Sequence, residues 1–242
     1  MVYIILGRML CSIKSHFMKI YLVVILLTFS FLSPAQNCSC ITKPNLNEII
    51  SCKKTTFKNG AKIYRQFNCD SSWIVFEGKN KKKKTLFSLD KELIELTEKL
   101  GFVSWTEYRK SFLIENRLIS GCCDPSEFIL FDKNNGEKIS DLGREIFHSQ
   151  ISQFPFFVSI DSENSNYLTF LNLDTNKIFK INLPKNRIKK TLEVTNELFI
   201  ETLFEEGQII NGVFEINYKY KKTGKDKWHI EKIFVDLKKH IS

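Results

Sequence analysis

Cysteines are the residues of this sequence with the clearest capacity for chemistry. Two of the seven, Cys122 and Cys123, are adjacent in the segment SGCCDPSEF. Adjacent Cα atoms lie about 3.8 Å apart, whereas the Cα atoms of ordinary disulfides lie about 4.4–6.8 Å apart. A bond between these two thiols would be strained, so we expect each to pair with a separate cysteine.

Six cysteines follow the apolar N-terminal segment, and an even number in an exported chain is typical of a disulfide framework. The candidates for disulfide bonding are Cys38, Cys40, Cys52, Cys69, Cys122 and Cys123. The Cys-Ser-Cys segment at 38–40 is the expected source of a partner for the adjacent pair. A two-residue Asn59-Gly60 turn would place Cys69 diagonally across a hairpin from Cys52, which makes Cys52–Cys69 a further candidate pair.

Metal binding and thiol catalysis have less support. Zinc sites prefer paired C-x2-C spacing, which C-x-C followed by C-C does not provide. A catalytic thiolate needs a neighbouring histidine and a lowered pKa, and nothing in the sequence brings His148, His229 or His240 to a cysteine. We therefore predict no metal site and no cofactor.

A run of lysines is the candidate binding site. It comprises Lys79, Lys81, Lys82, Lys83 and Lys84. These cations would suit the phosphates of lipopolysaccharide, an anionic glycan or an acidic protein. The alternative is a solvated hairpin tip, where charge also deters pairing between sheet edges.

The remaining motifs assign no catalytic residue. The segment DKNNGEKISD at 132–141 resembles a calcium loop loosely, but Gly136 falls at the fifth place instead of the sixth. An Asn135-Gly136 turn explains it better. The chain has no G-x-S-x-G elbow, H-E-x-x-H motif, Walker loop or dinucleotide fingerprint. Glycosidase chemistry needs only two suitably spaced carboxylates, so a small hydrolase remains the enzymatic alternative.

Strands joined by tight turns are the elements expected to position these residues. Residues 126–142 predict a strand, a turn at Asn135-Gly136 and a returning strand. Residues 167–183 predict a hairpin whose three-residue loop, 174–176, pairs Leu171 with Phe179 and so gathers apolar groups on one face.

The last hairpin is longer. Residues 213–237 predict two strands around a five-residue loop, 222–226, which would pair Tyr220 with Trp228. Past Glu231 the apolar residues shift to odd positions, which predicts a bulge.

Two short helices complete the expected elements. Residues 45–54 predict one, and 90–100 predict the clearer one, with Asp90 as its N-terminal cap and Gly101 as its end. The fold class is therefore mainly β, with antiparallel hairpins in a sandwich or open sheet and one or two short helices. A narrow apolar stripe on the second helix indicates that it lies on a sheet.

One repeated feature resembles the blades of β-propellers. Asp132 and Asp174 each end an apolar strand and open a polar turn. Their separation is similar to the repeat of about 40–45 residues in propeller blades. A small propeller-like arrangement is therefore the alternative architecture.

The N-terminal segment resembles a bacterial secretory signal. The apolar run from Ile20 to Leu32 is shorter than the about 20 residues that span a membrane. Small residues at Ser33 and Ala35 predict cleavage after Ala35. Met18 offers an alternative start, and an uncleaved anchor is the alternative to cleavage.

The domain prediction follows from that cleavage site. Residues 1–35 form a cleaved signal peptide, and residues 36–242 form one exported mainly-β domain whose part 36–72 is rich in cysteine. We expect no stable membrane span once the signal is removed. Hydrophobic residues make up 43% of the chain, enough to build a core.

Charge and the absence of catalytic motifs decide the functional prediction. Cleavage lowers the net charge from +9 to about +6, a mild excess that supports no nucleic-acid partner. We expect a periplasmic or secreted, disulfide-stabilised binding or accessory protein without catalytic activity. Its partner would be a protein or an envelope component. The alternatives are a small hydrolase with paired carboxylates and a periplasmic immunity or inhibitor protein.

Overall fold

The computed structural model shows a mainly-β protein. It describes residues 38–93, 102–117, 126–142, 144–151, 153–160, 166–184, 186–197, 199–225 and 227–241. Within these ranges, 15 antiparallel strands form four sheets, which confirms the predicted fold class. The predicted signal peptide, residues 1–35, lies outside the described residues. No helix in the described ranges is long and apolar enough to cross a membrane.

Each sheet consists of strands that follow one another along the chain. The first sheet contains β1 (Thr55–Thr56), β2 (Lys62–Phe67), β3 (Ser72–Glu77) and β4 (Lys83–Leu89). The second contains β5 (Phe102–Glu107), β6 (Ser111–Arg117), β7 (Glu127–Asp132) and β8 (Lys138–Leu142). The third contains β9 (Arg144–His148), β10 (Phe156–Ile160), β11 (Tyr167–Asn172) and β12 (Ile178–Asn182). The fourth contains β13 (Gln208–Ile210), β14 (Val213–Tyr220) and β15 (His229–Asp236).

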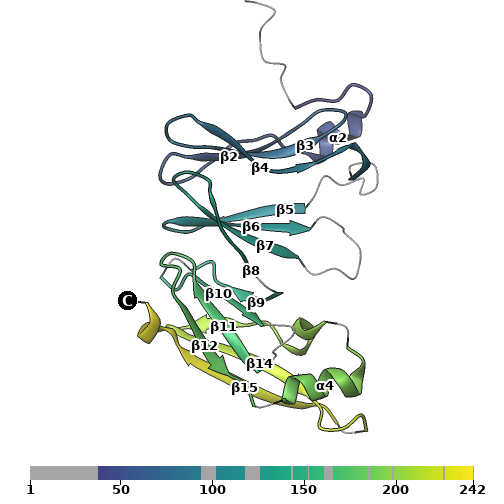
Figure 1. Cartoon of the computed structure of the whole chain (residues 1–242), viewed down its shortest axis with the longest axis vertical. Coiled ribbons are helices and arrows are strands. Elements are labelled where there is room, and N and C mark those ends of the chain that lie inside the picture. The colour runs from purple at the N-terminus through teal and green to yellow at the C-terminus, as the bar shows by residue number, and fades with distance from the viewer. Residues whose placement is uncertain are drawn as a thin grey trace, which may run out of the picture.

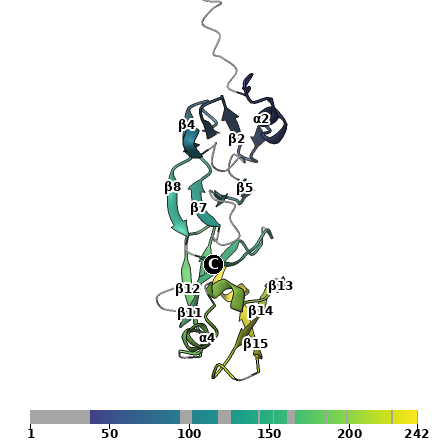
Figure 2. The same cartoon turned by 90° about the vertical axis from the view of Figure 1, so that its right-hand side faces the viewer.

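The first three sheets follow one another along the long axis of the molecule, and the fourth lies beside the third at the far end (Figure 1 and Figure 2). The first and fourth sheets lie at opposite ends in both views (Figure 2). Sheets of consecutive strands agree with the blade-like alternative, but the stack is open and does not close into a ring.

Apolar side chains fill the spaces between neighbouring sheets. Phe112 of the second sheet stacks on Phe76 of the first, with ring centroids 5.6 Å apart. Phe128 lies 5.4 Å from Phe157 of the third sheet, and Phe170 lies 5.4 Å from Phe214 of the fourth. The middle sheets are therefore buried on both faces, which explains their continuous apolar runs.

Three hairpin registers differ from prediction by one residue. In the first sheet, the Phe57 amide donates to the Ala61 carbonyl at 2.8 Å, so the loop holds three residues and Thr56 pairs with Lys62. Gly60 ends this loop with a φ of +87°, which glycine adopts without strain. A one-residue slip reverses the faces of a strand, so the predicted position of Cys52 is wrong.

The hairpin of β11 and β12 has a four-residue loop. The side-chain Oδ1 of Asn172 accepts from the amides of Asp174 and Thr175, both at 3.0 Å, so the turn begins earlier than predicted. Phe170, and not Leu171, pairs with Phe179. Asn172 is thus the counterpart of Asp132, whose carboxylate accepts from two turn amides in the same way.

The hairpin of β14 and β15 has a uniform register. Tyr220 pairs with His229 instead of Trp228, and the ladder continues without a shift to Val213 and Asp236. The predicted bulge past Glu231 is therefore wrong. The change in apolar parity arises because both faces of β15 carry apolar residues.

A disulfide-linked segment packs against one end of the first sheet, around Phe67 and Leu89. Residues 38–54 include the helix α2 (Pro44–Ile49) and pack Cys40, Leu46 and Ile50 against Phe67. The segment is held by Cys38–Cys52 and Cys40–Cys69 bonds. We call residues 38–54 the N-terminal cap.

These bonds correct the predicted pairing. Cys52 binds Cys38 and not Cys69, and Cys40 takes Cys69 instead of a cysteine of the adjacent pair. The physical reason is that β1 contains only two residues, so the chain leaves the sheet before it reaches Cys52. Cys122 and Cys123 lie outside the described residues.

The helices agree only in part with prediction. The helix expected over 45–54 ends at Ile49. The Asp90 carboxylate accepts from the Leu93 amide at 3.0 Å, as its capping role requires, and residues 94–101 lie outside the described part. Helix α4 (Arg187–Thr195) and the 3-10 turns η1 (Ile200–Leu203) and η2 (Leu237–His240) were not predicted.

Removal of either disulfide is expected to destabilise the cap. The Cys40–Cys69 bond spans 29 residues and the Cys38–Cys52 bond spans 14. Chain entropy predicts a loss of about 3 kcal/mol for each, with the longer loop contributing about 0.6 kcal/mol more. Urea unfolding of the C38A/C52A and C40A/C69A variants tests this order. Equal stability of wild type and both variants would contradict it.

Candidate functional site

The turns at one end of the sheets contact one another from sheet to sheet. The participating turns are those of β1–β2, β5–β6, β7–β8 and β11–β12. Two of these turns contain Asn-Gly, and the Asn59 and Asn135 side chains accept from the nearby amides of Ala61 and Glu137. The turns therefore bring polar groups that are distant in sequence to one surface.

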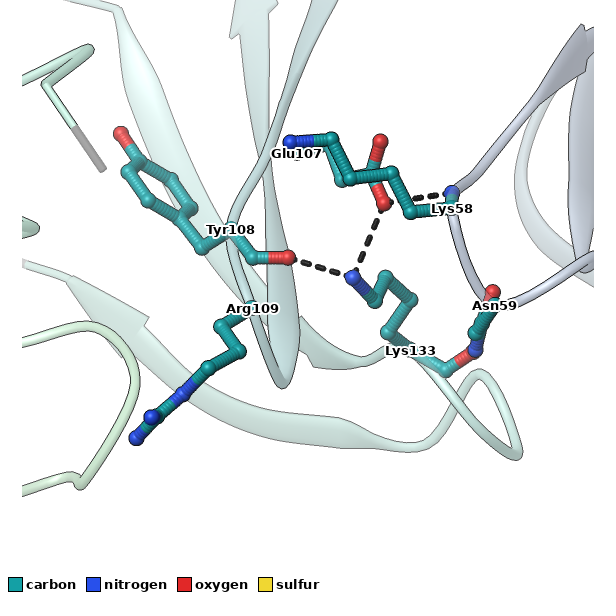
Figure 3. Close-up of a pocket in the computed structure, with 6 residues that line it drawn as sticks. All are labelled: Lys58, Asn59, Glu107, Tyr108, Arg109 and Lys133. Carbon is teal, nitrogen blue, oxygen red and sulfur yellow. Dashed lines mark hydrogen bonds and ion pairs between the residues drawn. The ribbon is translucent and has the colours of Figure 1, made fainter.

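Lys133 is the buried centre of this contact. Lys133 is only 4% exposed. Its Nζ donates to Glu107 Oε1 at 2.9 Å and to the Tyr108 carbonyl at 2.6 Å (Figure 3). A buried ammonium group needs both an opposite charge and hydrogen-bond acceptors. Lys133 has both, so its charge serves the structure and is not free for a ligand.

Glu107 joins the first sheet to the second. The same Oε1 that accepts from Lys133 also accepts from the Lys58 amide at 2.8 Å. The Asn59 side-chain amide donates to the Lys133 carbonyl at 2.7 Å. The β1–β2 turn is thereby fixed against two turns of the second sheet.

Asp174 joins the second sheet to the third. Its Oδ1 accepts from the Lys110 amide at 3.0 Å, and its Oδ2 lies 3.7 Å from Nε of Arg109. The Tyr108 hydroxyl donates to the Ser149 carbonyl at 2.8 Å. Burial, reinforced by the charges of Glu145 and Asp174, raises the pKa of Tyr108 far above its ordinary value, so this hydroxyl stays a donor.

A cleft of about 510 Å³ opens at the junction of the first and second sheets. It is lined by Lys58, Asn59, Glu107, Tyr108, Arg109 and Lys133. The Lys58 side chain is exposed, and that of Arg109 is 71% exposed. Lysine and arginine are the side chains that bind carboxylate, sulfate and phosphate, so the cleft suits an anionic group.

The predicted lysine run lies beside this cleft. Lys79 and Lys81 occupy the β3–β4 turn, Lys82 follows, and Lys83 and Lys84 begin β4. All five are exposed.

The position of the run follows from one backbone contact. A methyl group added at Gly78 would lie 3.6 Å from the Asn134 carbonyl, so the β3–β4 turn abuts the β7–β8 turn. We call the cleft and these five lysines together the basic turn surface.

Sequence reasoning missed the three cations of the cleft. Lys58, Arg109 and Lys133 are isolated in the sequence, and only the stacking of sheets brings them together. The available signal was their position, because each lies in a tight turn directly after a strand.

A second groove separates β9 from the start of the fourth sheet. It has a volume of about 510 Å³ and is lined by residues 145–151 and 206–209. His148 and Glu145 form a hydrogen bond in it. This bond raises the pKa of His148 against the opposing effect of burial, with further help from the charges of Glu145 and Glu115.

Neither groove gathers the ligands of a metal. Within the described ranges, no group of three or more His, Cys, Asp or Glu side chains could hold an ion. The loop at 132–141, which resembles a calcium site in sequence, uses the Asp132 carboxylate to bind its own amides.

Replacement of Lys133 by methionine is expected to lower the free energy of unfolding by about 3 kcal/mol, because the Glu107 charge would lose its buried partner. The K133M/E107Q variant should regain part of this loss. Urea unfolding measures both. K138M is the control, since Lys138 pairs with Asp141 at 53% and 66% side-chain exposure and should change stability little. A K133M effect no larger than that of K138M would refute the role of Lys133.

His148 is expected to make stability depend on pH. Because its pKa is raised in the folded protein, the protonated form stabilises the fold. This contribution is complete below the ordinary histidine pKa and is lost as pH rises through the raised value. The difference in unfolding free energy between wild type and H148Q should therefore shrink as pH increases from about 5.5 to 8. A constant difference would contradict this assignment.

Comparison with known proteins adds little to this geometry. No protein-family model and no curated protein matches the sequence. Among solved structures, the chain is similar to a hypothetical selenium-binding protein from Sulfolobus tokodaii, with a TM-score of 0.22 and 15% identity. The match covers 73% of this chain and 45% of that one. At this level the likeness carries no argument about fold or function.

Proposed function

We propose that the protein is an exported binding protein without catalytic activity, whose basic turn surface binds an anionic partner. The observation that carries this proposal is the cleft between Lys58 and Arg109 beside the five exposed lysines of the β3–β4 turn. The partner is an acidic protein or an anionic component of the envelope. An inhibitor or immunity protein would be one form of this function.

The charges of the basic turn surface are available to a ligand. Among the described residues, none of the five lysines pairs with a carboxylate. Arg109 faces Asp174 at 3.7 Å while most of its side chain remains in solvent. Binding of one anion by one exposed cation contributes little, so the affinity depends on several contacts with an extended ligand.

Two features support export. The N-terminal segment has the pattern of a secretory signal. The two disulfides of the N-terminal cap are typical of proteins that mature in an oxidising compartment. A polyanion of the cell envelope or an acidic secreted protein would be met there.

The test uses a defined polyanion. Isothermal titration with a heparin-type sulfated oligosaccharide should show saturable binding that weakens with salt. The K58E/R109E variant should bind about tenfold more weakly. The control is K189E/K190E, which makes the same charge change at two exposed positions of α4. An equal loss in both variants would show that net charge, and not the cleft, determines binding.

The second groove favours one alternative function. It contains two carboxylates, Glu145 and Glu206, together with His148, and paired carboxylates can hydrolyse glycosidic bonds. Turnover of a glycan or ester substrate, abolished by Glu206→Gln, would favour a small exported hydrolase over the binding protein.

A further inference from the structure

The fourth sheet differs from the other three in its number of strands. Three sheets have four strands each, whereas the fourth has the order β13-β14-β15. On the β13 side the ladder is extended by a bridge between Phe204 and Tyr218 and by the Glu205 amide, which donates to the Asn217 carbonyl. In the described part of the chain, no segment pairs with the outer edge of β15. This edge presents unpaired backbone groups along eight residues.

Apolar side chains cover the face of this sheet that points away from the stack. The register places Phe214, Ile216, Ile233 and Val235 on the inner face. The outer face carries the exposed residues Ile230 (63%), Phe234 (60%), Ile210 (46%) and Trp228 (40%). Apolar groups on both faces are typical of a sheet that is covered on both sides.

The opposite end of the stack shows what a covered end looks like. On the outer face of the first sheet, Tyr64 pairs with Val75, and these residues are only 2% and 4% exposed. Lys54, the last residue of the N-terminal cap, stands 4.7 Å over the Tyr64 ring on this face. No described segment covers the fourth sheet in this way. A clustered apolar face of this kind marks an interaction surface.

The charges on this outer face are mainly positive. Lys219 and Lys221 lie 5.2 and 4.9 Å from the Trp228 ring, and Lys232 lies 5.5 Å from the Phe234 ring. Glu215 is the acidic residue of the same face of β14, and it is paired with Lys232 at 3.5 Å. An excess of cations beside apolar groups favours a partner that presents both carboxylates and apolar side chains on one face.

We propose that the outer face of the fourth sheet docks an acidic protein segment in extended conformation, which pairs with β15 as a fourth strand. Backbone hydrogen bonds to β15 provide the affinity, and alternate side chains provide the specificity. Every second side chain of the segment lies on the outer face, where apolar ones pack on Ile230 and Phe234 and acidic ones lie on the same side as Lys219 and Lys221. A second copy of this chain fits poorly, because it would oppose the same lysines. This surface lies at the far end from the N-terminal cap and is separate from the basic turn surface (Figure 1).

The probe is a dye-labelled peptide of about ten residues, long enough to pair with all of β15. Valine and glutamate take turns at every second position and threonine fills the positions between, so that one face of the strand carries both. Fluorescence polarisation should show saturable binding to the wild-type protein. Phe234→Glu should weaken it at least about tenfold. The control is Ile178→Glu, because Ile178 is 62% exposed on the edge strand β12 and should leave binding unchanged. The K219E/K221E variant should also weaken peptide binding. The K58E/R109E variant, which alters the cleft of the basic turn surface, should leave peptide binding unchanged, so the two proposals can fail independently.

A second peptide tests strand pairing itself. Prolines at alternate positions remove the amide donors that a ladder needs, so this peptide should not bind. Equal binding of both peptides, or equal weakening by Ile178→Glu, would overturn the proposal. Two other results, if abolished by Phe234→Glu, would also overturn the proposal. Binding of vesicles that contain phosphatidylglycerol, without peptide binding, would indicate a membrane surface. Self-association in analytical ultracentrifugation would indicate that a second copy of the chain occupies this face.

Discussion

The Glu107 carboxylate links the first two sheets, because it accepts from the Lys58 amide of the first and from the buried ammonium group of Lys133 in the second. Each sheet has only three or four short strands, and sheets of this size depend on packing against a neighbour. Apolar stacking around Phe112 supplies the contact area, but such contacts are not directional. The bonds from Lys133 to Glu107 and Tyr108, with those from the β1–β2 turn, fix the angle and register of the sheets. The cleft between Lys58 and Arg109 exists because these turns are held in place.

The two ends of the stack solve the same physical problem in different ways. An inner sheet buries both faces against neighbours, whereas an end sheet has a face with none. At the N-terminal end, Tyr64 and Val75 on that face are only 2% and 4% exposed, and two disulfides hold the N-terminal cap against the sheet. At the C-terminal end, lysine stems and cation–π contacts shield part of Trp228 and Phe234 but leave them substantially exposed. The molecule is therefore asymmetric along its axis, with a closed end and an open one.

Sequence reasoning predicted the class of fold and the places of its turns better than the register of its strands. The turn at Asn135-Gly136 and the capping role of Asp90 occur as expected, and Asn59-Gly60 lies in a turn, although its loop has three residues and not two. The registers failed because Asn172 and Gly60 change loop length by one residue, an effect that turn composition hardly reveals. The face of β15 was misjudged because both of its faces are apolar. The cleft could not be predicted, since Lys58, Arg109 and Lys133 are neighbours only after the sheets stack.

The construction of each sheet from consecutive strands has a consequence for synthesis. Every strand ladder joins segments that are close in sequence, and each sheet packs only on the sheets before and after it. During synthesis the N-terminal part of the chain leaves the ribosome first, so one sheet can form before the strands of the next sheet have been made. Cys69 follows Cys40 within the first layer, so the covalent closure of the cap requires nothing from the rest of the molecule. Among the four described layers, the fourth would then form last, and its edge and outer face are the ones left available.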